Sequence, residues 1–147
     1  MFEVKVKYSR ENADGRIERV AESYIVNHDT CAAAEAFVLK VVEPYIMPGQ
    51  EVAVVSVKET PYKEGEVIVS DVFNEHDHRW YKAKVVLTVV DENRETKRPL
   101  VLLVDAENLI EAGREAQRQA DTYGCGYTLT AVQETNIMDV YLSPSYE

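Results

Sequence analysis

The 147-residue chain has few cysteines and no long apolar run, and both shortages exclude whole classes of protein. Its two cysteines, Cys31 and Cys125, lie far apart without CxxC spacing, which excludes a zinc cluster and a dense disulfide framework. We expect two buried thiols, and the alternative is that they form one oxidised pair. The longest apolar segment, residues 100–104, is far too short to cross a bilayer. Residues 1–5 lack the pattern of a secretory signal, so we expect a cytoplasmic protein without membrane contact.

Positive charge is also scarce, with 16 basic against 26 acidic side chains and a net charge of −10. A surface this negative repels phosphate groups, which disfavours binding of duplex DNA through a broad face. Apolar residues make up 46% of the chain, enough to bury a core and to exclude global disorder. The length suits one domain or two small modules that share a core.

The motifs of common enzyme classes are missing as well. The chain contains no GxGxxG, GxxxxGK[ST], HExxH or GxSxG pattern. Cys125 lies between two glycines, but it has no cationic neighbour in the sequence that would activate it as a nucleophile. His28 and Asp29 precede a predicted helix, where the carboxylate favours the helix start. We therefore expect a non-enzymatic protein without a cofactor.

The first half of the chain alternates between strand and helix patterns. The predicted strands cover residues 2–8, 16–26, 52–57 and 67–73. Asp14-Gly15 is a turn signal between the first two strands, because glycine tolerates positive φ. Thr30 is placed to cap an alanine-rich helix that ends before Pro48-Gly49.

The second half repeats this order of elements. Its predicted strands cover residues 80–90, 99–104, 127–133 and 137–142, with a charged turn over residues 91–98. Asn108 and Glu111 form the pattern of a capping box at the start of a helix over residues 108–123. The helix has an apolar stripe made mainly of alanine, and Gly124 suits its C-terminal end.

Short matches between the halves indicate an internal duplication. Val4-Lys5-Val6 matches Ala83-Lys84-Val85, and Glu59-Thr60 matches Glu134-Thr135 in the same structural context. We therefore predict an α+β fold of two tandem ββαβ(β) repeats about a pseudo-twofold axis, mainly antiparallel, with one helix per repeat. The repeats cover residues 1–73 and 80–142, with a linker over 74–79 and a flexible tail over 143–147, and we expect them to pack as one compact unit. The alternative is that any two alternating strands look alike.

Three segments of the second half form a recognisable pattern. They are Trp80-Tyr81-Lys82-Ala83-Lys84-Val85, Leu103-Val104-Asp105-Ala106 before a helix, and Glu134-Thr135-Asn136-Ile137-Met138-Asp139-Val140. The pattern resembles a family of small proteins of unknown function from gut Bacteroidales, their phages and mobile elements, over nearly the whole chain. The first half departs from it at residues 1–3, where an aromatic pair and a lysine would stand, and at the longer segment 62–67. The resemblance implies a phage or mobile-element setting and brings no catalytic residues.

Lysine and aromatic side chains mark the strands that open the two predicted repeats. They are Lys5, Lys7, Lys82 and Lys84, with Trp80 and Tyr81 beside the second pair. If the two strands are neighbours, the lysines form a basic stripe beside rings that stack on unpaired bases. The simpler interpretation is that the lysines solubilise an exposed sheet face and prevent pairing of sheet edges.

A histidine pair in the predicted linker has the residue types of a metal site. His76 and His78 project to one side of an extended segment, with Asp77, Asp71 or Glu75 close enough to complete the ligand set. The alternative is a solvated linker, because a bare HxH lacks a further ligand at recognisable spacing.

The nine tyrosines fall into two groups. Those at apolar-face positions are expected in the core with their hydroxyls at its rim: Tyr8, Tyr24, Tyr45, Tyr81, Tyr123 and Tyr127. Those in loop-like or terminal stretches, Tyr62, Tyr141 and Tyr146, are candidates to anchor a protein partner.

Together these features predict a small acidic binding protein that acts through a protein partner or through self-association, in a phage or mobile-element setting. The first alternative is an accessory single-stranded nucleic-acid-binding protein that uses the lysine and aromatic residues. The second is a metal-dependent activity at His76 and His78.

Overall fold

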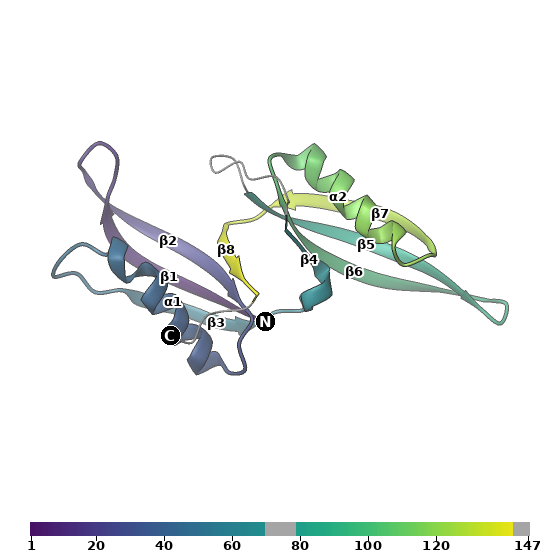
Figure 1. Ribbon diagram of the computed structural model, residues 1–147, viewed down its shortest axis with the longest axis horizontal. Helices are drawn as coiled ribbons and strands as arrows, with labels where there is room; N and C mark the ends of the chain where they lie inside the picture. Colours follow the sequence, from purple (N-terminus) through teal and green to yellow (C-terminus); the bar gives the residue numbers. More distant parts are fainter. Residues whose placement is uncertain (70–78, 143–147) are drawn as a thin grey trace. The chain divides into compact units, whose positions relative to one another are not determined.

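The computed structural model describes residues 1–69 and 79–142, which form two compact units (Figure 1). Unit 1 contains Met1–Pro61 and the C-terminal segment from Asn136, and unit 2 contains Tyr62–Thr135. Each unit is a four-stranded sheet with one α-helix on one face. The α+β class with mainly sheet and two helices is therefore confirmed.

Unit 1 is built from a hairpin, a helix and two further strands. Its elements are β1 (Phe2–Glu11), β2 (Ile17–Val26), α1 (Cys31–Val42), the 3-10 turn η1 (Glu43–Tyr45), β3 (Ala53–Glu59) and β8 (Ile137–Tyr141). The sheet has the order β3-β1-β2-β8. The pairs within β3-β1-β2 are antiparallel, and β8 lies parallel to β2.

The sequence explains the local structure of unit 1. Gly15 has a φ of +77° in the turn of the β1–β2 hairpin, where glycine carries no Cβ penalty. The Thr30 side chain accepts a hydrogen bond from the Ala33 backbone N–H at 3.1 Å and caps α1 as expected. The alternating side chains of β1 and β2 bury Val4, Val6 and Val26 against α1. Cys31, expected to be buried, is exposed because it is the first residue of α1.

Unit 2 has the same order of sheet pairings. Its elements are the 3-10 turn η2 (Glu64–Glu66), β4 (Val67–Ile68), β5 (Arg79–Asp91), β6 (Arg94–Ala106), α2 (Leu109–Asp121) and β7 (Gly126–Glu134). The sheet has the order β4-β6-β5-β7, with β4 parallel to β6 and the other pairs antiparallel.

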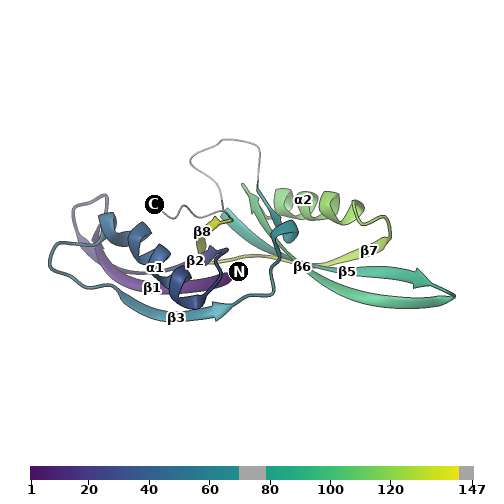
Figure 2. The same ribbon diagram turned by 60° about the horizontal axis from the view of Figure 1, so that its bottom comes forward.

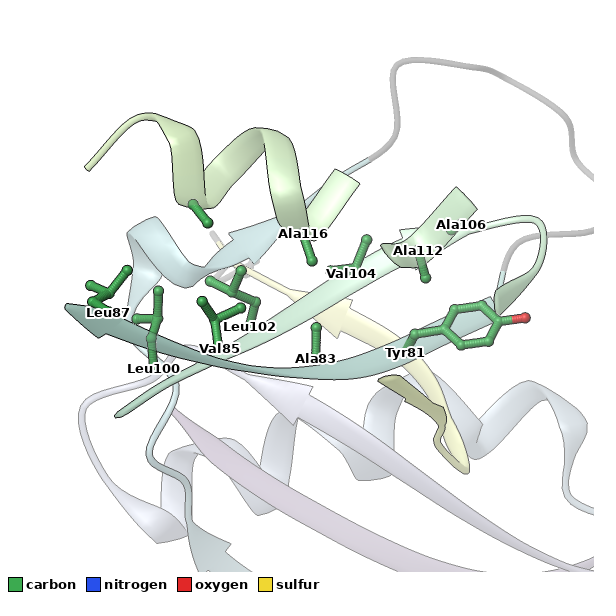
Figure 3. Close-up of a cluster of buried hydrophobic side chains, with 11 residues drawn as sticks. Tyr81, Ala83, Val85, Leu87, Leu100, Leu102, Val104, Ala106, Ala112 and Ala116 are labelled. Atoms are coloured by element: carbon green, nitrogen blue, oxygen red, sulfur yellow. The ribbon is translucent and has the colours of Figure 1, made fainter. Parts of the chain in front are cut away.

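Helix α2 packs on its sheet through small side chains. The Asn108 side chain accepts from the Glu111 backbone N–H at 2.9 Å and caps the helix, as its sequence pattern predicts. The alanines at positions 112, 116 and 120 are fully buried in the core cluster with β5 and β6. Figure 3 shows Ala112 and Ala116 facing the sheet. Figure 2 shows each α-helix lying over one face of its own sheet. The described residues include no helix long and apolar enough to span a membrane.

The hairpin formed by β5 and β6 differs from the expected charged turn over residues 91–98. The turn is confined to Glu92 and Asn93, which have φ of 45° and 68°, and β6 starts at Arg94. The pairing with β7 ends at Thr88, so the far end of the hairpin is a two-stranded ribbon that extends past α2 (Figure 1). Among the described residues no further strand pairs with this ribbon, and charged side chains suit such unpaired edges.

Two details of the strand pairing occur in both units. The pairing of β1 with β3 shifts register after Lys5, and that of β5 with β7 shifts after Lys84. Thr60 donates from its backbone N–H and its hydroxyl to the Met1 carbonyl, at 2.9 and 3.0 Å. Thr135 donates in the same way to the Trp80 carbonyl, at 3.0 and 2.7 Å.

The fourth strand of each sheet comes from a distant part of the chain. Strand β4 follows β3 in the sequence but pairs with β6, and β8 follows β7 but pairs with β2. The predicted repeats over residues 1–73 and 80–142 follow the order along the chain, whereas the compact units exchange these two edge strands. Pairing between distant strands leaves no local sequence signal, which explains the difference.

Candidate binding pocket in unit 1

A pocket of about 310 Å³ opens at the end of the unit 1 core. Side chains of five elements, β1, β2, α1, η1 and β8, line it. The sheet contributes Tyr8, Arg10, Glu22 and Tyr24, the segment of α1 and η1 contributes Val41 and Tyr45, and β8 contributes Met138, Asp139 and Tyr141. Six of these nine side chains carry a charge or a phenol and lie on the wall formed by β1, β2 and β8, so this wall of the pocket is polar.

Glu22 is the centre of this polar wall. Because side chains alternate along β2, Glu22 lies on the same sheet face as Tyr24 and Val26, and it is only 5% exposed. The hydroxyls of Tyr8 and Tyr24 both donate to Glu22 Oε1, the latter at 3.3 Å. The other carboxylate oxygen lies 3.6 Å from Arg10 Nη1. The buried charge is thus compensated by two phenols and one guanidinium.

The surrounding phenols are held in their neutral form. Burial, the hydrogen bond to Glu22 and its negative charge raise the pKa of Tyr8 to about 12. Burial and the Glu22 charge also raise the pKa of Tyr24. Burial and the neighbouring Asp139 carboxylate raise the pKa of Tyr141 to about 12. At neutral pH all three are therefore hydrogen-bond donors rather than phenolates.

Strand β8 closes one side of the pocket. Asn27 holds the strand end, because its backbone N–H donates to the Tyr141 carbonyl at 2.8 Å and its side chain donates to the Leu142 carbonyl at 3.0 Å. The Tyr141 ring stacks on Tyr24 at 6.3 Å between centroids and meets Phe37 edge-on at 4.9 Å. Tyr141, predicted as a contact for a protein partner, is a half-buried part of the pocket wall.

The corresponding positions of unit 2 are apolar. Val6 in β1 pairs with Glu22, whereas Val85, at the same place after the register shift in β5, pairs with Leu100. By the same register, Leu87 and Leu102 stand where unit 1 has Tyr8 and Tyr24. Figure 3 shows these leucines packed beneath α2 with Val85. Unit 1 thus has a polar pocket wall at the positions where unit 2 has a hydrophobic core.

The predicted lysine and aromatic surface is not assembled by strand pairing. The lysines at positions 5 and 7 lie in β1, which pairs with β2 and β3, and those at positions 82 and 84 lie in β5, which pairs with β6 and β7. Tyr81 is 3% exposed in the unit 2 core (Figure 3), and Trp80 is 7% exposed. Neither ring is available to stack on an unpaired base, which corrects that part of the interpretation.

The predicted metal ligands His76, Asp77 and His78 lie outside the described residues, as do Asp71 and Glu75. Within residues 1–69 and 79–142, no group of three or more His, Cys, Asp or Glu side chains is arranged to hold a metal ion. Tyr62, the other predicted partner contact, is half-buried.

Sequence reasoning missed the pocket for a physical reason. Glu22 lies within an alternating strand pattern, and a single glutamate in such a pattern is expected to face solvent. The residues that close the pocket are in β8, and the hydrogen bond from Asn27 to Leu142 joins positions 115 apart. The available signal was the group of tyrosines near Glu22 at core-face positions.

Comparison with known proteins gives one informative match. A family model described as Domain of unknown function (DUF4494) matches residues 1–144. No curated protein and no solved structure matches the chain.

Proposed function

The chain belongs to this family of unknown function, and we propose that it is a non-enzymatic binding protein that holds a protein partner through the unit 1 pocket. The observation that carries the proposal is the set of Tyr8, Glu22 and Tyr24 at positions where unit 2 has leucines. Burying a carboxylate costs several kcal/mol before its partners compensate it, and a hydrophobic replacement is often as stable or more so. Because these three polar side chains lower the stability of the unit, their presence is better explained by recognition of a ligand than by a structural role.

The state of the polar groups supports binding rather than catalysis. Glu22 Oε1 already accepts from both phenols, and its other oxygen faces Arg10. The raised pKa values of Tyr8 and Tyr24 keep both phenols protonated, so neither supplies an anionic nucleophile at neutral pH. A preorganised, internally satisfied network of this kind is suited to orienting a bound group.

The internal duplication is part of the same proposal. The register shifts after Lys5 and Lys84, and the paired hydrogen bonds of Thr60 and Thr135, support two copies of a ββαβ(β) unit. Under this view one copy kept an apolar core while the other acquired the pocket. The pseudo-twofold relation and the phage or mobile-element setting stay predictions.

A peptide selection tests the function. Peptides from a random displayed library are selected on the full chain, and their contacts are mapped by NMR through the signals of Tyr8, Tyr24 and Met138. We expect binders that shift these signals and lose binding to the Y8L/E22L variant, which copies the unit 2 side chains at these two positions. Binders that act elsewhere, or that bind this folded variant equally well, would contradict the proposal.

A further inference from the structure

We infer that the unit 1 pocket recognises a basic side chain, the ammonium of lysine or the guanidinium of arginine, presented by the partner protein. This inference rests on the proposed function and names the chemical group that the pocket takes. It is drawn from the charge, the aromatic lining and the size of the pocket.

The charge around the pocket is negative. The lining contains two carboxylates, Glu22 and Asp139, and one cation, Arg10. Arg10 also pairs with Glu18, since its Nε lies 3.4 Å from a Glu18 carboxylate oxygen. An anionic ligand would have to compete for a guanidinium that already pairs with two carboxylates. A cationic ligand would instead be attracted by the excess of negative charge in the pocket.

The aromatic lining favours the same kind of ligand. Tyr24 and Tyr141 form a stacked pair on one wall, and Tyr45, 63% exposed, stands at the opening. The face of an aromatic ring carries negative charge density, and a cation above it is attracted more strongly when the site is desolvated. Phenol hydroxyls and carboxylate oxygens also accept hydrogen bonds from ammonium and guanidinium groups.

The size of the pocket selects a single side chain. Its volume of about 310 Å³ is at the lower end of the range of ligand pockets. The pocket is open to solvent, so a residue of a partner segment can enter while its backbone stays outside. The net charge of −10 would attract a basic segment from a distance, which agrees with the local charge.

The test uses three matched probes, the acetylated and amidated peptides Gly-Ser-Xaa-Ser-Gly with arginine, norleucine or glutamate as Xaa. Each is titrated into the full chain and followed by NMR. We expect the arginine peptide to shift the signals of Tyr24, Met138 and Tyr141 saturably, with an affinity at least about tenfold above that of the other two. A lysine peptide should behave like the arginine peptide.

Three variants locate the charge that matters. E22Q and D139N remove one carboxylate each with little change of shape, and each should weaken the arginine peptide by about threefold to tenfold. E95Q makes the same change at an exposed carboxylate on the unit 2 hairpin and should have no effect. Because E22Q alters a buried group, circular dichroism checks its fold, and D139N gives an independent result.

The outcomes separate the inference from the proposed function. Equal binding of the norleucine or glutamate peptide at the pocket would overturn the basic-residue inference and leave the proposed function standing. Failure of the selected library peptides to reach the pocket would overturn both. Shifts by the arginine peptide that E22Q and D139N leave unchanged would also overturn the inference.

Discussion

The buried carboxylate of Glu22 is the residue that most distinguishes the two units. It is 5% exposed and stabilised only because Tyr8, Tyr24 and Arg10 compensate its charge. Removing one member of such a network leaves the others unsatisfied, whereas removing the polar groups together restores an apolar wall. The network should therefore respond very differently to single and combined substitutions.

The first prediction compares E22L with Y8L/E22L/Y24L. E22L alone leaves the Tyr8 and Tyr24 hydroxyls without their acceptor and Arg10 with Glu18 as its remaining carboxylate, and it should lower the free energy of unfolding by about 1–3 kcal/mol. Y8L/E22L/Y24L, which removes both phenols with the carboxylate, should be neutral or stabilising relative to wild type, by up to about 4 kcal/mol. Urea denaturation followed by circular dichroism measures both.

The reciprocal variant L87Y/L100E/L102Y serves as the control in unit 2. The position corresponding to Arg10 there is Val89, so a new carboxylate would be buried without a cation. This variant should lose about 3–5 kcal/mol. A Y8L/E22L/Y24L variant that is destabilised as strongly would contradict the view that the polar groups of the pocket lower the stability of unit 1.

The second prediction concerns the titration of Tyr8. Its pKa is raised from 10.0 to about 12 by burial and by Glu22, so the fold favours the neutral phenol. The resulting stabilisation is complete below pH 10 and declines as the pH rises toward about 12, because the unfolded chain releases this proton first. NMR titration of the Tyr8 ring should find this midpoint.

E22Q provides the control for that titration. It removes the charge that helps to raise the pKa of Tyr8 while burial remains, so the Tyr8 midpoint should fall part of the way toward 10. An unchanged midpoint in E22Q would contradict the role assigned to the carboxylate.

At the residue scale, local chemistry was predictable and burial of polar groups was not. Thr30 and Asn108 were identified as caps because capping depends on a few adjacent residues. The half-buried position of Tyr141 depends on Tyr24 and Phe37, which are distant in sequence. Tyr45 and Tyr123, expected in the core, are 63% and 42% exposed because both follow the last turn of a helix.

Strand β8 is the element on which the pocket depends. It is a five-residue edge strand, and it contributes Met138, Asp139 and Tyr141 to the pocket wall. Asn27 fixes its end through one backbone and one side-chain hydrogen bond. A short edge strand with few contacts is expected to open locally before the rest of its sheet.

The third prediction is that N27A loosens β8 selectively. The substitution removes the side-chain bond to the Leu142 carbonyl and keeps the backbone bond, so the cost should be about 0.5–1.5 kcal/mol. Hydrogen exchange at the β8 amides should accelerate by about threefold to tenfold, while exchange in β5 stays unchanged.

T135V is the matched control for N27A. It removes one side-chain hydrogen bond, from Thr135 to the Trp80 carbonyl, at the end of β7. Its effect on exchange should centre on β7. Equal acceleration of β8 by both substitutions, or none by N27A, would contradict the anchoring role of Asn27.

At the element scale, the sequence patterns were sufficient for most helices and strands but not for their pairing. The capping box and alanine stripe predicted α2 within a few residues, because both signals are local. The charged residues 94–98 were expected to form a turn, yet they are the first residues of β6 and pair with β5 in the two-stranded end of the hairpin. The parallel pairing of β8 with β2 follows from tertiary structure alone.

At the scale of the whole molecule, the exchange of edge strands links the stability of the units. The chain leaves unit 1 at Pro61 and returns to it at Asn136, so β8 pairs with β2 across a loop that contains all of unit 2. When unit 2 is folded, most of this loop is already ordered, so the pairing of β8 with β2 costs little further chain entropy. When unit 2 is unfolded, closing a flexible loop of its length costs unit 1 about 4 kcal/mol.

The order of elements was predictable at this scale, and the boundaries of the compact units were not. Periodicity assigns each segment a type, and the matches of Glu59-Thr60 with Glu134-Thr135 align the halves. Strands β4 and β8 could each pair within their own half of the chain or with the other half. The choice depends on which sheet edges are unpaired after folding, and a local sequence pattern carries no information about that.

The last prediction follows from this linkage between the units. L102A removes a fully buried side chain from the unit 2 core and should cost about 2–5 kcal/mol. Thermal unfolding is monitored by Trp80 fluorescence for unit 2 and by the Tyr8 and Tyr24 NMR signals for unit 1. Both midpoints should fall together, because once unit 2 unfolds, the pairing of β8 with β2 must close a long flexible loop. V90A, at a side chain 71% exposed on the hairpin, should move neither midpoint appreciably. A unit 1 midpoint that stays at its wild-type value while that of unit 2 falls would mean that the exchanged strands leave the two units energetically independent.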